Sequence, residues 1–222
     1  MADQNRAARE ADAFLERIIH KRPPEPRPVD RPAKRARGPA ARDAVFFGGI
    51  PLRHDDYGVL CNHDDAPVTI DGEYFLTAEH ALQHFKLRCA ADAATDSGDA
   101  RRSRELRLLM RLFAGKATTI TAYEQVRQLS RAINLSHDEL RLWKTRSEAF
   151  QERVCLYKFT QSPALRDALR DTGDALIVKQ CKTSDPSDPS CFWGGFLDRD
   201  GKLVGANKLG RMWMRIRDSF CK

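Results

Sequence analysis

From Val45 onward, the hydrophobic and polar positions repeat in ways that predict regular structure. VFFGGI at 45–50 indicates a strand. APVTIDGEYFLT at 66–77 indicates a β-hairpin, because the turn pair Asp71-Gly72 separates two alternating apolar runs. Apolar residues at helical spacing then predict four helices, at 77–89, about 101–114, 119–133 and 137–160.

Capping residues place the ends of two helices. Ser136 is suited to cap the long fourth helix, with Glu139 completing a capping box. In the segment SPALRDALRDTGDA, Ser162 is suited to cap a short helix that has Pro163 at its first position and ends at Gly173. The boundaries of these two helices are therefore predicted from local chemistry.

The C-terminal part alternates between short apolar runs and polar loops. LIVKQC at 176–181 indicates a short strand, and residues 182–206 form a polar, Gly-rich segment predicted as a loop. A final helix is predicted from apolar residues at helical spacing: Leu209, Met212, Trp213, Ile216 and Phe220. The fold class expected from all these elements is mainly α with a small β-sheet.

Most of the net charge of +7 belongs to the segment before the predicted domain. Residues 21–42 are Pro-rich and hold eight Lys and Arg against two acids, so the rest of the chain is nearly neutral. We expect a disordered basic tail over 1–43, with a marginal helix at 5–20, followed by one domain over 44–222. The run PAKRARGP within the tail is either a nuclear-localisation or polyanion-binding run, or a solvated linker.

The cysteines and the hydropathy favour an intracellular protein. The six cysteines form no CxxC pair, which argues against a zinc ribbon or a redox motif, and without a signal peptide we expect reduced thiols. No apolar run approaches the roughly 18 residues of a membrane span. We expect a soluble protein of the cytoplasm or nucleus that does not engage a membrane.

The helix predicted at 77–89 has an unusual polar edge. Glu79, Gln83 and Lys86 flank its apolar stripe instead of opposing it. Glu79 and Lys86 are about 10.5 Å apart along the axis, too far for an ordinary salt bridge, yet both side chains can lean toward a small ligand between them. The alternative is that all three residues make hydrogen bonds within the fold.

Several ordered motifs resemble the YbiA-like, or NADAR, family of N-glycosidases. The similarity covers about 44–220 and begins in DDYGVLCNHDDAPVTIDGEYFLTAEHALQHFKL. It continues through Trp143, KFTQSPALRDALRDTGDALIV, FWGG and GANKLGRMWMRIR. In the first block the matching residues are Asn62, Asp71, Gly72, Glu79, His80, Gln83 and Lys86.

The chain also departs from the family pattern. Ala81 replaces an aromatic residue, and Lys179 stands where the family has an acid. The segment KTSDPSDPSCFWG lacks the usual acid close before the tryptophan, although Asp185 or Asp188 precedes it. The segment 89–103 is longer than typical. These differences bear on the substrate more than on the fold.

The resemblance implies a single YbiA-like domain that cleaves an N-glycosidic bond of ribose without a cofactor. Glu79 is the candidate proton partner, since a carboxylate can stabilise an oxocarbenium ion or relay protons. Lys86, beside Leu82 and Phe85, is the candidate nucleophile, because burial lowers an amine's pKa and a neutral amine can form a Schiff base with the sugar.

The substrate-binding candidates are Asn62, His80, Gln83, Trp143, Lys158, Asp174, Trp193, Gly194 and Asn207. Lys158 is either a competing nucleophile or a boundary residue whose ammonium reaches solvent. Trp143 either stacks on a base or lies in the core. Trp193 and Gly194, in FWGG, are expected to form a ligand wall.

For Asn207, Asp174 and the two histidines of the helix at 77–89, the interpretation rests on local pattern. Asn207, after Gly205 at the start of the final helix, either helps to bind phosphate or only caps the helix. Asp174 is suited to bond ribose hydroxyls. His80 and His84 have a spacing that metals use, but no third ligand is evident, so a metal site is not expected.

The resemblance implies riboflavin-pathway intermediates as substrates of some family members and ADP-ribose on guanine as the substrate of others. The leading functional hypothesis is removal of ADP-ribose from ADP-ribosylated guanine in nucleotides or nucleic acid, by a protein that is expected to be monomeric. The basic tail would help it to approach a polyanion. The alternatives are an N-glycosidase of riboflavin-biosynthesis intermediates and a non-catalytic ADP-ribose-binding module. A nucleic-acid-binding protein is disfavoured by the nearly neutral domain.

Overall fold

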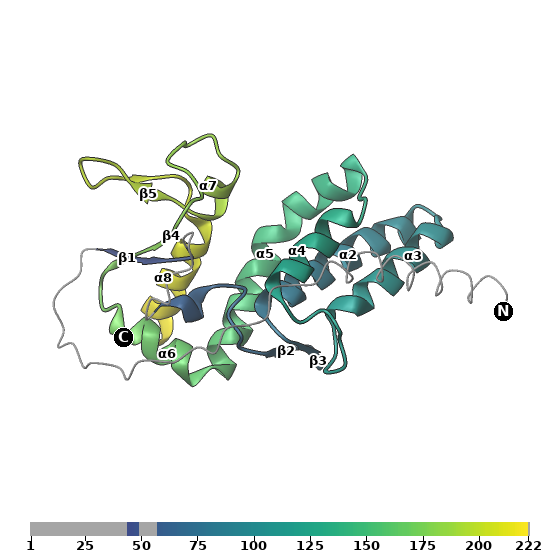
Figure 1. Cartoon of the computed structure of the whole chain (residues 1–222), viewed down its shortest axis with the longest axis horizontal. Helices are drawn as coiled ribbons and strands as arrows, with labels where there is room; N and C mark the ends of the chain where they lie inside the picture. The colour runs from purple at the N-terminus through teal and green to yellow at the C-terminus, as the bar shows by residue number, and fades with distance from the viewer. Residues whose placement is uncertain (1–43, 49–56, 222) are drawn as a thin grey trace.

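Two long helices, α2 (Ala78–Asp96) and α5 (His137–Gln161), run through the middle of the fold (Figure 1). The structure is a computed structural model and describes residues 44–48 and 57–221. Within these ranges the fold is mainly helical with small two-stranded sheets, as the sequence predicts. The predicted tail, 1–43, lies outside the described residues.

The remaining helices are short. They are η1 (Gly58–Leu60), α3 (Ala100–Met110), η2 (Arg111–Phe113), α4 (Tyr123–Ala132), α6 (Pro163–Asp171), α7 (Ser190–Trp193) and α8 (Lys208–Phe220). In Figure 1, α3 and α4 lie beside α2 and α5 in one part of the molecule, while α6, α7 and α8 lie in the other. The functional candidates come from both parts.

Each sheet pairs two strands. β1 (Ala44–Phe47) lies parallel to β4 (Leu176–Lys179), with Phe47 opposite Lys179. β2 (Val68–Ile70) and β3 (Glu73–Phe75) form the predicted antiparallel hairpin. Asp71 and Gly72 both have positive φ, 53° and 83°, as the turn type favoured in such hairpins requires. β5 (Phe196–Leu197) pairs with β6 (Leu203–Val204).

The predicted caps are confirmed. The Ser136 side chain accepts a hydrogen bond from the Glu139 N–H at 3.2 Å, and the Glu139 carboxylate accepts one from the Ser136 N–H at 2.7 Å. Ser162 caps α6, which begins with Pro163. Local chemistry was sufficient at these helix ends because each cap bonds within one turn.

Two predicted helix boundaries and one predicted loop are wrong. α2 continues to Asp96, because Ala90, Ala91 and Ala94 are buried on it and contact with α3 extends its apolar face. α4 begins at Tyr123 and not at 119. The predicted loop at 182–206 contains α7 and the β5–β6 hairpin. β5 and β6 pair with each other, and the Ala206 N–H donates to the Cys191 carbonyl of α7.

Three clusters of buried side chains form the core. One joins β1, β4, the end of α5, α6 and α8, and in it the indole of Trp213 is fully buried and donates to the Leu60 carbonyl at 3.0 Å. A second joins α2, α3 and α4. A third joins the β2–β3 hairpin to α2 and α5. The N-terminal half of α2 therefore packs against the β2–β3 hairpin and α5, and its C-terminal half packs against α3 and α4.

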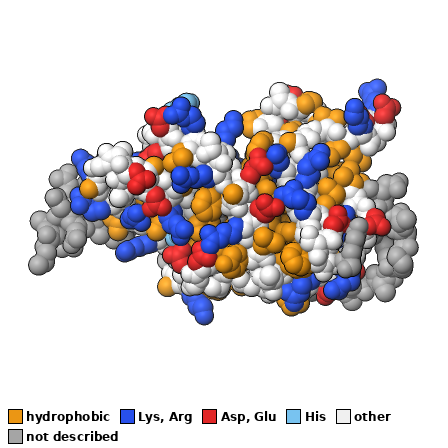
Figure 2. Space-filling view, turned by 180° about the vertical axis from the view of Figure 1, so that it is seen from behind, with side chains coloured by type: hydrophobic (Ala, Val, Ile, Leu, Met, Phe, Trp, Pro, Cys, Tyr) orange, Lys and Arg blue, Asp and Glu red, His pale blue; other side chains and the backbone are white. Residues whose placement is uncertain are grey.

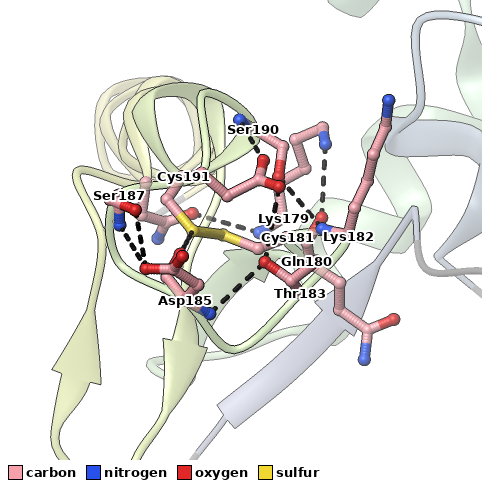
Figure 3. Close-up of a disulfide and its surroundings, with 11 residues drawn as sticks. Lys179, Gln180, Cys181, Lys182, Thr183, Asp185, Ser187, Ser190 and Cys191 are labelled. Atoms are coloured by element: carbon pink, nitrogen blue, oxygen red, sulfur yellow. Dashed lines mark hydrogen bonds between the residues drawn. A yellow bond between two sulfur atoms is a disulfide. The ribbon is translucent and has the colours of Figure 1, made fainter.

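The expectation of reduced thiols is wrong for two of the cysteines. Cys181 and Cys191 form a disulfide with their Cα atoms 5.3 Å apart (Figure 3). The intervening segment folds back because Asp185 and Asp188 accept local hydrogen bonds from Ser187 and Ser190. The sequence spacing of ten residues carries no signature of this pairing, which depends on the fold of the loop.

One face of the described residues is mixed in charge. Figure 2 shows basic and acidic side chains interspersed over one face, with hydrophobic side chains between them. Among the helices described, none is both long enough and apolar enough to cross a bilayer.

Candidate functional site

The first turn of α2 fixes the position of Glu79. The Thr77 hydroxyl caps the helix by accepting from the His80 N–H, and the Glu79 N–H donates to the Asn62 carbonyl at 2.7 Å. The first N–H groups of a helix have no acceptor within the helix, and the Asn62 carbonyl provides one for Glu79. The carboxylate is held where α2 meets the segment after η1.

A hydrogen-bonded row connects Glu79 to α4. Gln83 donates through Nε2 to the Glu79 carboxylate at 2.8 Å, and its Oε1 accepts from the Ser130 hydroxyl at 2.8 Å. Burial raises the pKa of Glu79, while the bond from Gln83 and the positive charges of Lys86 and Lys179 lower it in part. The net shift is upward, so the carboxyl keeps its proton to higher pH than an exposed one.

Lys86 lies on the same edge of α2. Burial lowers the pKa of its ammonium, and the negative charge of Glu79 opposes that shift. Lys86 lines a cavity of about 410 Å³ together with residues of α4 and the start of α5. Glu79 does not line this cavity. A ligand site between the side chains of Glu79 and Lys86 therefore stays a prediction.

Lys179, at the end of β4, is a second lysine close to Glu79. Burial lowers the pKa of Lys179, and the charge of Glu79 raises it in part. Its Nζ donates to the Gln180 carbonyl at 3.3 Å. The sequence marks this residue only as a departure from a family pattern. β4 pairs in parallel with β1, and Phe47 lies opposite Lys179.

Two aromatic rings complete the group around Glu79. His63 and Tyr123 have ring centroids 4.6 Å apart. Burial lowers the pKa of His63, with further lowering by Lys158 and Lys179, and burial together with the charge of Glu79 raises the pKa of Tyr123. Sequence reasoning missed both rings, because neither lies in a periodic pattern and sixty positions separate them.

Asn62 and Lys158 hold the segment that carries His63. Asn62 and the buried Gln151 exchange two amide hydrogen bonds, at 2.9 and 3.1 Å. Lys158, only 2% exposed, donates to the carbonyls of Val59 and Cys61 at 2.6 and 2.7 Å and lies 3.5 Å from the Asp64 carboxylate. Three acceptors satisfy its three N–H donors. These contacts give Lys158 a structural role.

Asn207 and Gly194 hold the end of β4. Asn207 is fully buried, accepts from the Lys179 N–H at 3.0 Å and donates to the Ile177 carbonyl at 2.8 Å. A Cβ on Gly194 would lie 2.5 Å from the Lys179 carbonyl oxygen, so only glycine allows this approach. Both residues therefore position Lys179 through its backbone.

The other candidates make contacts within the fold. His80 uses both ring nitrogens in the fold, at 2.8 Å from the Thr77 hydroxyl and 2.7 Å from the Ile120 carbonyl. Trp143 stacks on Phe150 and packs against the core.

Trp193 and Asp174 come from the other part of the fold. Trp193 packs edge-on against Phe192 and against the core cluster of α8. Asp174 is exposed before β4, about 16 Å along the chain from Lys179 at ordinary strand rise.

The comparisons with known proteins concern the whole domain. The family model described as the NADAR domain matches residues 51–221. The NMR structure of the E. coli protein YbiA is similar, with a TM-score of 0.51 and 22% sequence identity, over 81% of this chain and 86% of that chain. None of the curated proteins matches the sequence of this chain. The YbiA likeness concerns the fold alone.

Proposed function

The chain belongs to the NADAR family, a family associated with N-glycosidase activity, and on this premise we propose that it removes ADP-ribose from ADP-ribosylated guanine in nucleotides or nucleic acid. The observation that carries the proposal is a cluster of three half-buried ionisable residues, Glu79, Lys86 and Lys179, in which the charge of Glu79 acts on both lysines. Burial favours the protonated acid and the neutral amine, which are the forms that glycosidic cleavage requires.

The proposed reaction begins at C1 of the ribose. Lys86, as the free amine, attacks C1 while the bond from C1 to the guanine nitrogen breaks, and protonated Glu79 gives its proton to the departing base. The Glu79 carboxylate then takes a proton from Nζ and passes it to the ring oxygen as the C1–O bond opens. Water adds to the resulting Schiff base, which releases ADP-ribose and the free amine.

Aromatic and polar neighbours would assist this reaction. The His63–Tyr123 pair offers an aromatic wall next to Glu79 for a base or ribose ring. Gln83 keeps its amide nitrogen toward Glu79, because its oxygen is occupied by Ser130. Lys179 would contribute positive charge beside the acid.

Borohydride trapping tests the mechanism. The protein is incubated with ADP-ribosylated guanosine and, separately, with the ribosylamino-pyrimidine intermediates of flavin synthesis, with and without borohydride. We expect free ADP-ribose from the first substrate and a reduced adduct on Lys86, located by peptide mass mapping. Release of ribose 5-phosphate from the second substrate alone would instead assign the riboflavin alternative.

A matched pair of variants separates the lysine's role from general effects. Lys86→Ala should lose the adduct and reduce turnover by about 10³-fold or more. Lys144→Ala, which changes an exposed lysine of α5, should behave as the unchanged protein. Full activity of Lys86→Ala would exclude the proposed nucleophile, and absence of turnover on both substrates would favour a binding module.

A further inference from the structure

The cavity beside Lys86 has a lining of distinctive chemistry. Its volume is about 410 Å³, within the range of small-molecule sites. The Arg131 guanidinium, the Lys86 amine and two neutral polar residues, Ser130 and Asn134, form part of its wall. The lining contains no carboxylate. A cavity with a guanidinium and no acid favours an anionic ligand.

The rest of the wall is aliphatic. Ile133 and Leu135 are nearly buried, whereas Leu140 leaves 44% of its surface exposed. A flat apolar group such as a nucleobase could lie against these side chains, and Asn134 could bond its polar edge. A positive group, an amide and an apolar surface in one cavity are the features that recognise a nucleotide.

Hydrogen bonds within the protein hold the wall of the cavity in place. The Arg102 guanidinium donates to the Asn134 carbonyl at 2.7 Å and makes two bonds of 2.9 Å to the Glu139 carboxylate. Glu139 in turn accepts from the Ser136 N–H at the start of α5. A ligand would therefore meet a wall that is already ordered, so binding would cost little conformational entropy.

The cavity is joined to the reactive cluster. Lys86 lines it directly, and Ser130 in its wall donates to Gln83, which donates to Glu79. A molecule that fills the cavity thus lies next to the lysine of the proposed reaction. This adjacency favours a part of the substrate over an unrelated ligand.

We propose that this cavity is a subsite for a nucleoside 5′-phosphate, with the phosphate on Arg131 and the base against Leu135 and Leu140. This rests on the proposed function, in which the nucleotide is part of the substrate. The same chemistry can come from the adenosine phosphate half of ADP-ribose or from the guanosine phosphate that carries the modification.

Isothermal titration calorimetry on the full chain tests the subsite without turnover. The probes are GMP, AMP, guanosine, adenosine and inorganic phosphate. We expect at least one nucleotide to bind about 10-fold or more tightly than its nucleoside and than phosphate alone. Tighter binding of AMP would assign the ADP-ribose half, and tighter binding of GMP would assign the nucleotide that leaves.

Three variants locate the binding. Arg131→Gln should weaken nucleotide binding about 10-fold and leave nucleoside binding unchanged, because it removes the phosphate contact. Leu140→Ser should weaken both. Arg141→Gln is the matched control. Arg141 is exposed, follows Leu140 on α5 and pairs only with Asp138 among the described ion pairs. Melting curves check that each variant folds.

The two proposals can fail separately. If no nucleotide binds, or if Arg131→Gln and Leu140→Ser bind as the unchanged protein does, the subsite is wrong even where borohydride traps Lys86. If nucleotide binding depends on Arg131 but neither substrate is cleaved, the subsite stands and the proposed enzyme activity fails.

Discussion

Burial and neighbouring charges act in opposite directions on the pKa of Glu79. Burial raises its pKa, and Lys86 from its own helix and Lys179 from β4 lower it. Because an acid that donates a proton must hold it at working pH, the balance between burial and these two charges would set the pH range of the proposed reaction. The effect of Lys179 on the pKa of Glu79 can therefore be tested through the pH dependence of activity.

Lys179→Gln should shift the pH profile. Removal of the positive charge raises the pKa of Glu79 further, so the protonated form persists to higher pH and the alkaline limb of the kcat profile moves upward. Lys182→Gln, a change of an exposed lysine nearby, should leave that limb in place. A limb that moves downward or stays fixed in Lys179→Gln would contradict the coupling.

Lys158→Met should affect folding more than chemistry. The change leaves the carbonyls of Val59 and Cys61 without their donor, and it should lower the free energy of unfolding by about 2–4 kcal/mol. Urea unfolding measures this loss. The borohydride adduct on Lys86 should still form; an adduct that maps to Lys158 in the unchanged protein would reverse the two roles.

At the scale of elements, the site depends on how β4 ends. β1 pairs with β4, Asn207 bonds the backbone of Ile177 and Lys179, and the Gly195 N–H donates to the Lys179 carbonyl at 2.8 Å. The Cys181–Cys191 disulfide closes the segment that follows (Figure 3). The position of Lys179 is thus a property of several connected segments.

Gly194→Ala should disturb this arrangement. The new methyl group would meet the Lys179 carbonyl at 2.5 Å, so the backbone must move, at a cost of about 1–3 kcal/mol in unfolding free energy. Gly58→Ala is a matched control, because a Cβ there meets nothing within 4 Å. Equal stability of the two variants by thermal unfolding would show that β4 tolerates the displacement.

For the whole molecule, charge is divided between the segment before the domain and the domain itself. Residues 21–42 hold eight Lys and Arg, while the face of the domain in Figure 2 mixes both signs. A basic segment beside a nearly neutral domain would increase affinity for polyanionic substrates without sequence preference. It would give no such advantage on a free nucleotide.

Replacement of Lys34, Arg35 and Arg37 by Gln tests this division in the full chain. The kcat/KM for ADP-ribosylated oligonucleotide should fall. The slope of log(kcat/KM) against log salt concentration should become less negative by about 1–3. Cleavage of ADP-ribosylated guanosine should not change. The control replaces Arg6, Arg9 and Arg17, which removes equal charge outside the basic segment; equal effects of the two triple variants would argue against a role for that segment.

Prediction from sequence succeeded where one turn or one helix face carries the information. The Asp71-Gly72 turn, the Ser136 and Ser162 caps and the apolar face of α8 are local features, and the structure contains them. The polar edge of α2 was also visible as spacing. His63, Tyr123 and Lys179 could not be placed, because distant segments bring them together.

The sequence by itself determined the helical fold class, the family motifs and the row Glu79, Gln83 and Lys86, since helical periodicity fixes which side chains share an edge. The tertiary structure decided what surrounds that row. It used Lys158, Asn207 and His80 as internal hydrogen-bonding groups and brought Lys179 to the acid. The physical reason is that burial and long-range hydrogen bonds depend on segments far apart in the chain, which no local pattern records.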